Sequence, residues 1–170
     1  SVGAGAFSWC SSLEEVTIPA SLQEIGPNAF SNLASLPAFE VARSNPVFSA
    51  PGGALYNTPE LRFVAWPPFS PQTACVIEGG TQSIASSAFQ NCGTLTEVTL
   101  PEGLLDIGAY AFSNCVGIQK ITIPASVTSI GQDAFRVTTV WEKGIKLQVP
   151  KPSYAYDYAR ENGVPYEIVP

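Results

Sequence analysis

The sequence contains no histidine. Because histidine is the commonest general base and metal ligand, its absence removes the Ser–His and Cys–His dyads and the usual zinc sites. The sequence also lacks the C-x-x-C spacing of many metal sites and any run of about 18 apolar residues that could span a membrane. We therefore expect that the chain is not an enzyme, and that it has no cofactor, no metal site and no direct membrane insertion.

Basic residues are also scarce, with 8 Lys and Arg against 14 Asp and Glu, and the formal net charge is -6. Nucleic acids and anionic membranes are bound largely through clustered Lys and Arg, so neither is an expected partner. The 170 residues are 45% hydrophobic and 13% charged, which is typical of a single globular domain.

What the sequence does contain is a repeat. In one register the dipeptide Ala-Phe recurs with its phenylalanine at Phe7, Phe30, Phe89, Phe112 and Phe135, and a further copy, Ala38-Phe39, lies outside that register. Three of the four intervals are 23 residues long. The fourth, from Phe30 to Phe89, is 59 residues long, which is 23 plus 36. A fixed period of this length indicates a solenoid, in which each unit buries its apolar face against its neighbours.

Each unit carries the pattern of two short strands. In the segment 95–101, Val98 and Leu100 alternate with a threonine, and a proline ends the run, which predicts a strand of a parallel sheet. A second apolar pair, Leu104 and Ile107, predicts a shorter strand on the opposite wall of the core. The Ala-Phe-Ser-Asn-Cys stretch is expected to turn the corner as a single helical or 3₁₀ turn.

Together these positions follow the pattern I-G-x-x-A-F-x-N-C-x-x-L-x-x-V-x-I-P, which resembles the BspA-type leucine-rich repeat of bacterial surface and secreted proteins. The clearest matches are Ile107-Gly108, Ala111-Phe112, Asn114-Cys115 and Ile123-Pro124. The resemblance covers nearly the whole chain. It implies a leucine-rich-repeat solenoid of the α/β horseshoe class, with mostly short parallel β-strands and short helical or 3₁₀ turns. It also implies a secreted or cell-surface location and binding of other macromolecules, since some relatives are adhesins.

We expect one solenoid domain over residues 1–170. Its repeats occupy about 1–41 and 72–150, an inserted β-hairpin occupies about 42–71, and a helix-strand cap occupies about 150–170. Because the sequence opens in the middle of a repeat, we expect it to be a piece of a longer array.

One candidate binding surface is the outward column of the first strands, which comprises Thr17, Glu40, Val76, Thr99 and Thr122. Strand faces of solenoids commonly bind ligands. Threonine is also simply a favourable strand residue, so a purely structural role is the alternative interpretation.

The other candidate surface is the insert, which concentrates Phe48, Tyr56, Phe63, Trp66 and Phe69. Exposed aromatic rings, with Tyr56, Phe63 and Trp66 as the candidates, would anchor a protein or a glycan. The same rings would instead form a small satellite core if the hairpin folded over the solenoid.

The four cysteines are interpreted mainly as core residues. Cys10, Cys92 and Cys115 share one repeat column with Leu33, and Cys75 lies in an inward strand column. Buried free thiols are the favoured interpretation, with a Cys92–Cys115 disulfide or a metal site as alternatives. Trp141 is expected to belong to the core beneath the cap.

The resulting hypothesis is a non-catalytic protein- or glycan-binding module of a bacterial surface protein, with a role in adhesion. An architectural spacer without a ligand of its own is the main alternative. An enzyme that acts on polysaccharide is a remote one, because the carboxylates are scattered and no pair is placed for acid–base chemistry.

Overall fold

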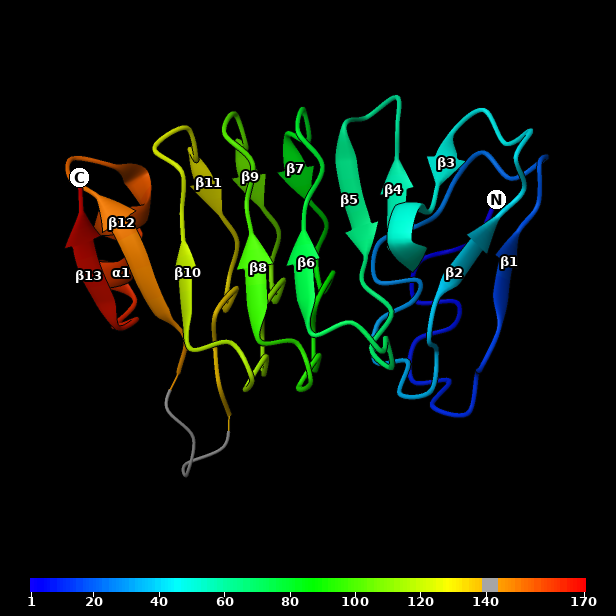
Figure 1. Ribbon diagram of the computed structural model, residues 1–170, viewed down its shortest axis with the longest axis horizontal. Coiled ribbons are helices and arrows are strands. Elements are labelled where there is room, and N and C mark those ends of the chain that lie inside the picture. Colours follow the sequence, from blue (N-terminus) through cyan, green and yellow to red (C-terminus); the bar gives the residue numbers. More distant parts are fainter. Residues whose placement is uncertain (139–143) are drawn as a thin grey trace.

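The computed structural model describes residues 1–138 and 144–170. The chain winds into an elongated solenoid with two walls of short strands, and its termini lie toward opposite ends (Figure 1). The first wall contains β1 (Val16–Ile18), β2 (Phe39–Val41), β6 (Ala74–Val76), β8 (Glu97–Thr99), β10 (Lys120–Thr122), β12 (Lys146–Pro150) and β13 (Tyr166–Val169). The second wall contains β3 (Phe48–Ser49), β4 (Leu55–Asn57), β5 (Arg62–Ala65), β7 (Ser83–Ile84), β9 (Asp106–Ile107) and β11 (Ser129–Ile130).

The first wall confirms the strands predicted from the alternating pattern. Its strands pair in parallel, with Val16 opposite Phe39 and Cys75 opposite Val98. Within β8 the central Val98 points into the core while its neighbours are exposed, as a period of two requires. Hydrogen bonding divides this wall into three sheets, β1-β2, β6-β8 and β10-β12-β13.

The second wall is one continuous sheet of six strands, in the order β11-β9-β7-β5-β4-β3. Its members β7, β9 and β11 are the shorter strands predicted for each repeat. The predicted insert supplies the other three strands. There β4 pairs antiparallel with β5 to form the expected hairpin, and β5 then pairs in parallel with β7. The last strand of the insert is therefore part of the solenoid wall.

Trp66 is a further member of the phenylalanine column, which the count of Ala-Phe pairs missed. It lies one repeat length before Phe89 and follows an alanine, Ala65. The Trp66 amide donates to the Ala88 carbonyl at 2.8 Å, just as the Phe89 amide donates to the Ala111 carbonyl at 2.8 Å. The long interval between Phe30 and Phe89 therefore consists of one normal repeat and one enlarged repeat that carries the insert.

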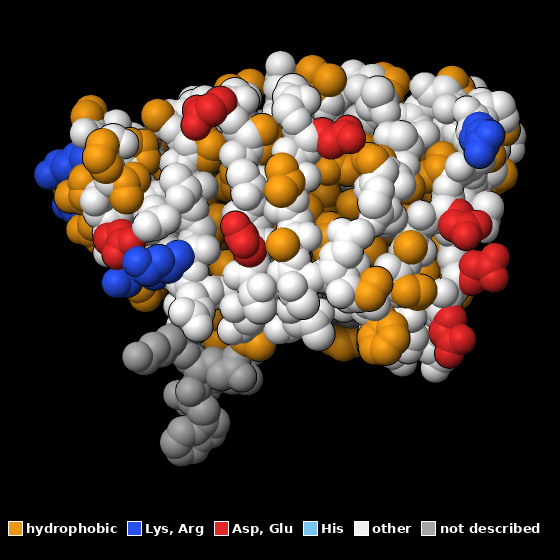
Figure 2. Space-filling view, in the orientation of Figure 1, with side chains coloured by type: hydrophobic (Ala, Val, Ile, Leu, Met, Phe, Trp, Pro, Cys, Tyr) orange, Lys and Arg blue, Asp and Glu red, His pale blue; other side chains and the backbone are white. Residues whose placement is uncertain are grey.

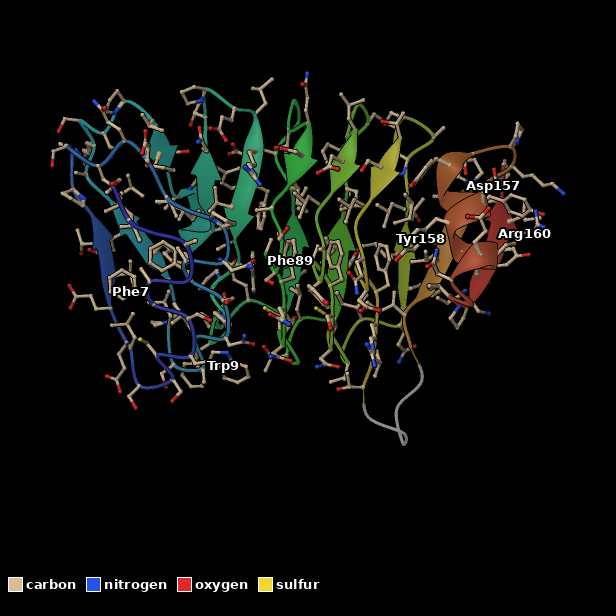
Figure 3. The ribbon with its side chains drawn as sticks, turned by 180° about the vertical axis from the view of Figure 1, so that it is seen from behind. Phe7, Trp9, Phe89, Asp157, Tyr158 and Arg160 are labelled. Atoms are coloured by element: carbon tan, nitrogen blue, oxygen red, sulfur yellow. The ribbon has the colours of Figure 1, made fainter. Side chains whose placement is uncertain are left out.

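Stacked aromatic rings run along the core. The Phe112 ring lies 4.8 Å from the Phe89 ring and 5.4 Å from the Phe135 ring, centroid to centroid and nearly parallel. Tyr158 closes the C-terminal end of the stack edge-on at 6.3 Å, whereas Phe7 lies at the N-terminal end (Figure 3). Truncation of such buried rings typically costs about 3–5 kcal/mol, so this column contributes strongly to stability.

The corners between the walls are successive hydrogen-bonded turns. In one of them the Gln90 amide donates to the Ser87 carbonyl at 3.1 Å and the Cys92 amide donates to the Phe89 carbonyl at 3.1 Å. Ser87 and Asn91 have positive φ angles of 58° and 62°, which interrupts the right-handed turn predicted as a helical or 3₁₀ segment.

The C-terminal cap agrees with the predicted helix and strand. Helix α1 (Tyr154–Glu161) begins after Ser153, whose hydroxyl accepts a hydrogen bond from the Tyr156 amide at 3.1 Å, and it ends at Asn162. It buries Ala155, Tyr158 and Ala159 against the last coils, and β13 pairs with β12. Trp141, which is expected beneath the cap, lies outside the described residues.

Candidate binding surfaces

The three candidate aromatic residues of the insert are buried, which differs from the exposed rings that the binding interpretation requires. Tyr56 is 6% exposed, Phe63 0% and Trp66 4%. Phe63 stacks on Phe89 at 4.6 Å, and the edge of Tyr56 packs on Phe63 at 5.0 Å. The rings are buried because the last strand of the insert joins the second wall and points them into the main core. These three rings therefore follow the alternative interpretation, in which the aromatic residues of the insert pack into a core.

Burial also changes the ionisation of Tyr56. Loss of solvent around the phenol raises its pKa to about 12, against the weaker effect of a hydrogen bond from the Glu78 amide. The hydroxyl accepts that bond at 3.4 Å and therefore ties the insert to the following coil. In the insert the exposed aromatic ring is Phe69, which is not among the three predicted contact residues.

The strand-column candidates are all on the outside of the first wall. Thr17, Glu40, Thr99 and Thr122 are exposed, and Val76 is 73% exposed in the same column. The register places Thr17 beside Glu40 and Val76 beside Thr99, while Thr122 lies beside Gln148 of β12. We call this column, Thr17, Glu40, Val76, Thr99, Thr122 and Gln148, the outer strip.

Charge is separated along the face that carries the outer strip. Acidic side chains lie over the β1-β2 end and over the middle of this face, whereas the basic ones lie mainly at the β10-β12 end (Figure 2). At the second end Glu167 pairs with Lys120 at 2.8 Å and with Lys146 at 3.5 Å, and it accepts a hydrogen bond from Gln148 at 2.7 Å. These contacts lower the pKa of the Glu167 carboxyl to about 2. The hydrogen bond from Lys120 is the largest cause, and the hydrogen bond from Gln148 is the second. The one carboxylate offsets one of the two lysine charges, so this end stays positive, while Val76 and Thr99 in the middle of the strip are uncharged.

A groove of about 340 Å³ lies between β8 and β10 on this face. It forms where the first wall changes from one sheet to the next, because no strand pairing joins β8 to β10 in the described part of the chain. Thr99 and Thr122 lie on its two sides, with Glu97 and Lys120 beside them. The structure thus brings two of the predicted candidates together around a shallow polar groove.

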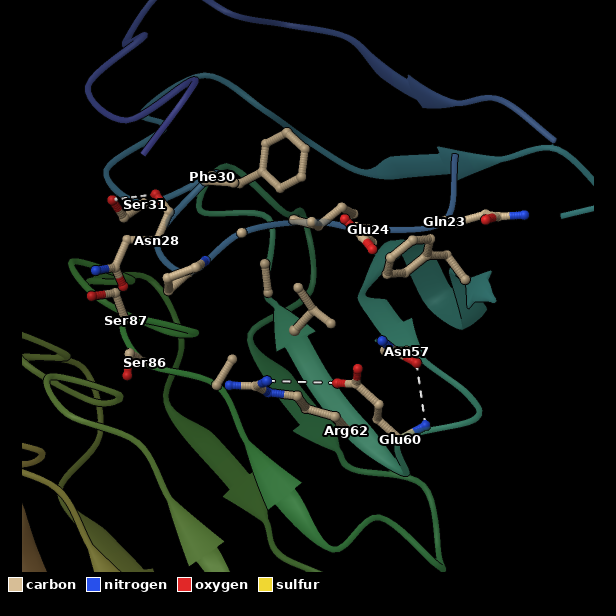
Figure 4. Close-up of a pocket in the computed structure, with 18 residues that line it drawn as sticks. Gln23, Glu24, Asn28, Phe30, Ser31, Asn57, Glu60, Arg62, Ser86 and Ser87 are labelled. Atoms are coloured by element: carbon tan, nitrogen blue, oxygen red, sulfur yellow. Dashed lines mark hydrogen bonds and ion pairs between the residues drawn. The ribbon is translucent and has the colours of Figure 1, made fainter. Parts of the chain in front are cut away.

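A larger pocket, of about 500 Å³, lies on another part of the molecule, between the insert and the second coil, which is the one that contains Phe30 (Figure 4). Its lining comes from three segments, 23–31, 48–65 and 85–87. Within it Arg62 forms an ion pair with Glu60 at 3.6 Å, and the Asn57 side-chain oxygen accepts a hydrogen bond from the Glu60 amide at 3.2 Å. Sequence reasoning missed this pocket, although the interruption of the regular period marked its place.

Three of the four thiols are buried and all four are free. Burial raises the pKa of Cys75 and of Cys115 to about 12, and it raises that of Cys92 well above its ordinary value. Cys10 differs from the favoured interpretation because it is exposed. It belongs to the first coil, where the column is not enclosed by coils on both sides.

Two absences hold for the described residues. Across 1–138 and 144–170, no three Cys, Asp or Glu side chains gather closely enough to hold a metal ion. In the same ranges, no helix has the length and apolar character needed to cross a bilayer.

The repeated geometry agrees with a known family. The family described as "BspA type Leucine rich repeat region (6 copies)" matches residues 1–68 and 69–148. The chain belongs to this family. No curated protein matches the chain in sequence.

Solved structures of bacterial leucine-rich repeat proteins share the fold. A leucine-rich repeat protein from Eubacterium ventriosum is 23% identical with a TM-score of 0.71, over 83% of this chain and 37% of its own. The pneumococcal vaccine antigen PcpA is 18% identical with a TM-score of 0.66, over 92% of this chain and 56% of its own. A leucine-rich cell surface protein from Faecalibacterium prausnitzii is 19% identical with a TM-score of 0.63, over 99% and 51%. The chain therefore spans between about a third and rather more than half of these proteins.

Proposed function

We propose that this chain is a non-catalytic binding module of a bacterial secreted or cell-surface protein, and that it holds a protein ligand on the outer strip. The observation that carries the proposal is the outer strip itself. Its side chains project from paired strands whose inward neighbours, such as Val98 and Ile121, are buried in the core. Binding residues held on a rigid scaffold lose little conformational entropy when a ligand binds.

The composition of the strip favours a protein surface. Specific protein interfaces are depleted of charge at their centre and polar at their rim. The strip follows this arrangement, with Val76 and Thr99 near its middle and charged side chains at both ends. The descriptions of two similar structures as a cell surface protein and a vaccine antigen support the surface location, and adhesion is the role that we propose there.

The test is a binding screen of the purified chain against matrix glycoproteins and mucins, repeated with a Val76→Arg, Thr99→Arg variant. Both side chains are exposed, so the change alters the strip without filling the core. The matched control is Leu105→Arg, Thr128→Arg, an exposed apolar-threonine pair beside the second-wall strands β9 and β11.

We expect saturable binding to at least one protein component, weakened about tenfold or more by the strip variant and unchanged by the control. Equal loss in both variants, or binding that survives in the strip variant, would contradict the outer strip as the site. The absence of any saturable binding would favour the spacer.

A further inference from the structure

The pocket between the second coil and the insert forms where the regular hydrogen bonding between coils is interrupted. In the fourth coil, which contains Phe89, amides at alternate positions donate to carbonyls of the next coil, Ser87 to Ala109 at 2.9 Å and Phe89 to Ala111 at 2.8 Å. The amides at the equivalent repeat positions of the second coil are those of Asn28 and Phe30. Among the described residues neither of these two amides has a backbone acceptor.

Carbonyl groups of the second coil also lack the backbone hydrogen bonds that their equivalents make. In the fourth coil the Gln82 carbonyl accepts from the Leu105 amide at 2.8 Å, and the Ile84 carbonyl accepts from the Gly108 amide at 2.9 Å. Their equivalents are the carbonyls of Gln23 and Ile25, which accept no backbone hydrogen bond from the described part of the chain. Both residues line the pocket, as do Asn28 and Phe30. One side of the pocket therefore offers main-chain donors and acceptors at fixed spacing.

Side chains supply further polar groups from the opposite side. The Nε atom of Arg62 is buried and has no hydrogen-bond partner among the described residues, although another nitrogen of the same guanidinium faces Glu60 at 3.6 Å. The hydroxyls of Ser86 and Ser87 and the Asn57 amide complete this side (Figure 4). The Arg62 side chain as a whole is 41% exposed and lines the pocket, so the rest of its guanidinium, and not the enclosed Nε atom, is the part that a bound polar group can meet.

We propose that this pocket binds a neutral saccharide unit. A sugar hydroxyl both donates and accepts hydrogen bonds, which fits a lining in which main-chain amides, carbonyls, hydroxyls and a guanidinium alternate. The volume of about 500 Å³ lies within the range of about 300–1,000 Å³ that is usual for small-ligand sites.

The charge of the lining disfavours an acidic sugar, because Glu24 and Glu60 outnumber the one cation, Arg62. The lining also disfavours an extended peptide added as a strand, since specificity in that mode comes from pockets for alternate side chains. The two aromatic rings of the lining, Phe30 and Phe48, are buried, so neither is open to an inserted side chain. The saccharide would bind away from the outer strip, because the pocket lining includes no residue of the strip.

The experiment is saturation-transfer NMR of the whole chain with glucose, galactose, mannose and N-acetylglucosamine, and with glucuronate as the acidic comparison. Arg62→Gln removes the guanidinium, and Ser86→Tyr fills the pocket. Each has a matched control at a distant corner. Arg136→Gln breaks a similar exposed ion pair, with Asp133 at 3.4 Å, and Gln132→Tyr adds the same ring at the Ser86 repeat position two coils on. Thermal melts establish that every variant is folded.

We expect saturable transfer to at least one neutral sugar, with a dissociation constant raised about tenfold or more by each pocket variant and unchanged by the controls. The Val76→Arg, Thr99→Arg strip variant should keep this binding, so the pocket and the strip are tested separately. Lack of transfer to every neutral sugar, transfer to glucuronate alone, or binding that persists in Ser86→Tyr would overturn the proposal.

Discussion

Replacement of Phe112 by alanine should destabilise the protein far more than the same replacement of Phe7. Phe112 is 0% exposed and stacks on a ring at each side, at 4.8 Å and 5.4 Å. Its truncation leaves a closed cavity in the centre of the column, which typically costs about 3–5 kcal/mol. For a chain of this size, that corresponds to a fall in melting temperature of about 6–20 °C.

Phe7 provides the matched comparison because it occupies the same repeat position at the open end. It is 39% exposed and stacks on one ring, Phe30, at 5.6 Å. Truncation of its ring leaves a space that is open to solvent instead of a closed cavity. We therefore expect the free energy of unfolding to fall by about 1–2 kcal/mol.

The assay is thermal and urea denaturation of both variants beside the unaltered chain, followed by circular dichroism. Urea midpoints separate the stability change from any change in the surface exposed on unfolding. Equal shifts in the two variants would refute the argument, because the stacking order and the difference in burial would then have no energetic consequence.

Three further predictions concern other positions. Gly108→Ala should destabilise the chain strongly, because a Cβ there would lie 2.4 Å from the Ser86 nitrogen, whereas Gly79→Ala meets no atom within 4 Å and should be nearly neutral in the same melts. Glu167→Gln should make the urea midpoint less sensitive to acid: its depressed pKa adds stability above pH 4.5 that is lost as the pH falls toward 2, and an equal acid dependence in both proteins would contradict this. In the native chain a thiol reagent should label Cys10 alone, and all four cysteines only after unfolding; fast native labelling of Cys92 would show that the core is open.

The repeat and both strand columns could be predicted from the sequence because their causes are local and periodic. Val98 and Ile107 are buried as their place in the repeat requires, and a proline within two residues ends the strands β1, β8 and β10. The helix of the cap was equally predictable, since Ser153 and Asn162 are residues that favour helix ends.

The insert was harder to predict because its placement depends on pairing between distant segments. Nothing local in the sequence shows that β5 pairs with β7, and that pairing is what buries Phe63 and Trp66. The pocket depends on the same event, since it lies where the second coil loses its regular neighbour. The prediction that Cys10 is buried is wrong for a related reason. Its repeat position is buried only in coils that have a neighbouring coil on both sides.

The insert also separates the apolar core into two clusters. Leu55 and Ala65 belong to the N-terminal cluster, while Tyr56 and Phe63 belong to the larger cluster that extends to the C-terminal helix. In a solenoid, neighbouring coils transmit a tensile load in series, so the junction with the fewest cross-links yields first. Within the described ranges, coil-to-coil hydrogen bonds are missing beside the pocket, so we expect tension along the axis to separate the two clusters there first, with the strands of the insert as the remaining link.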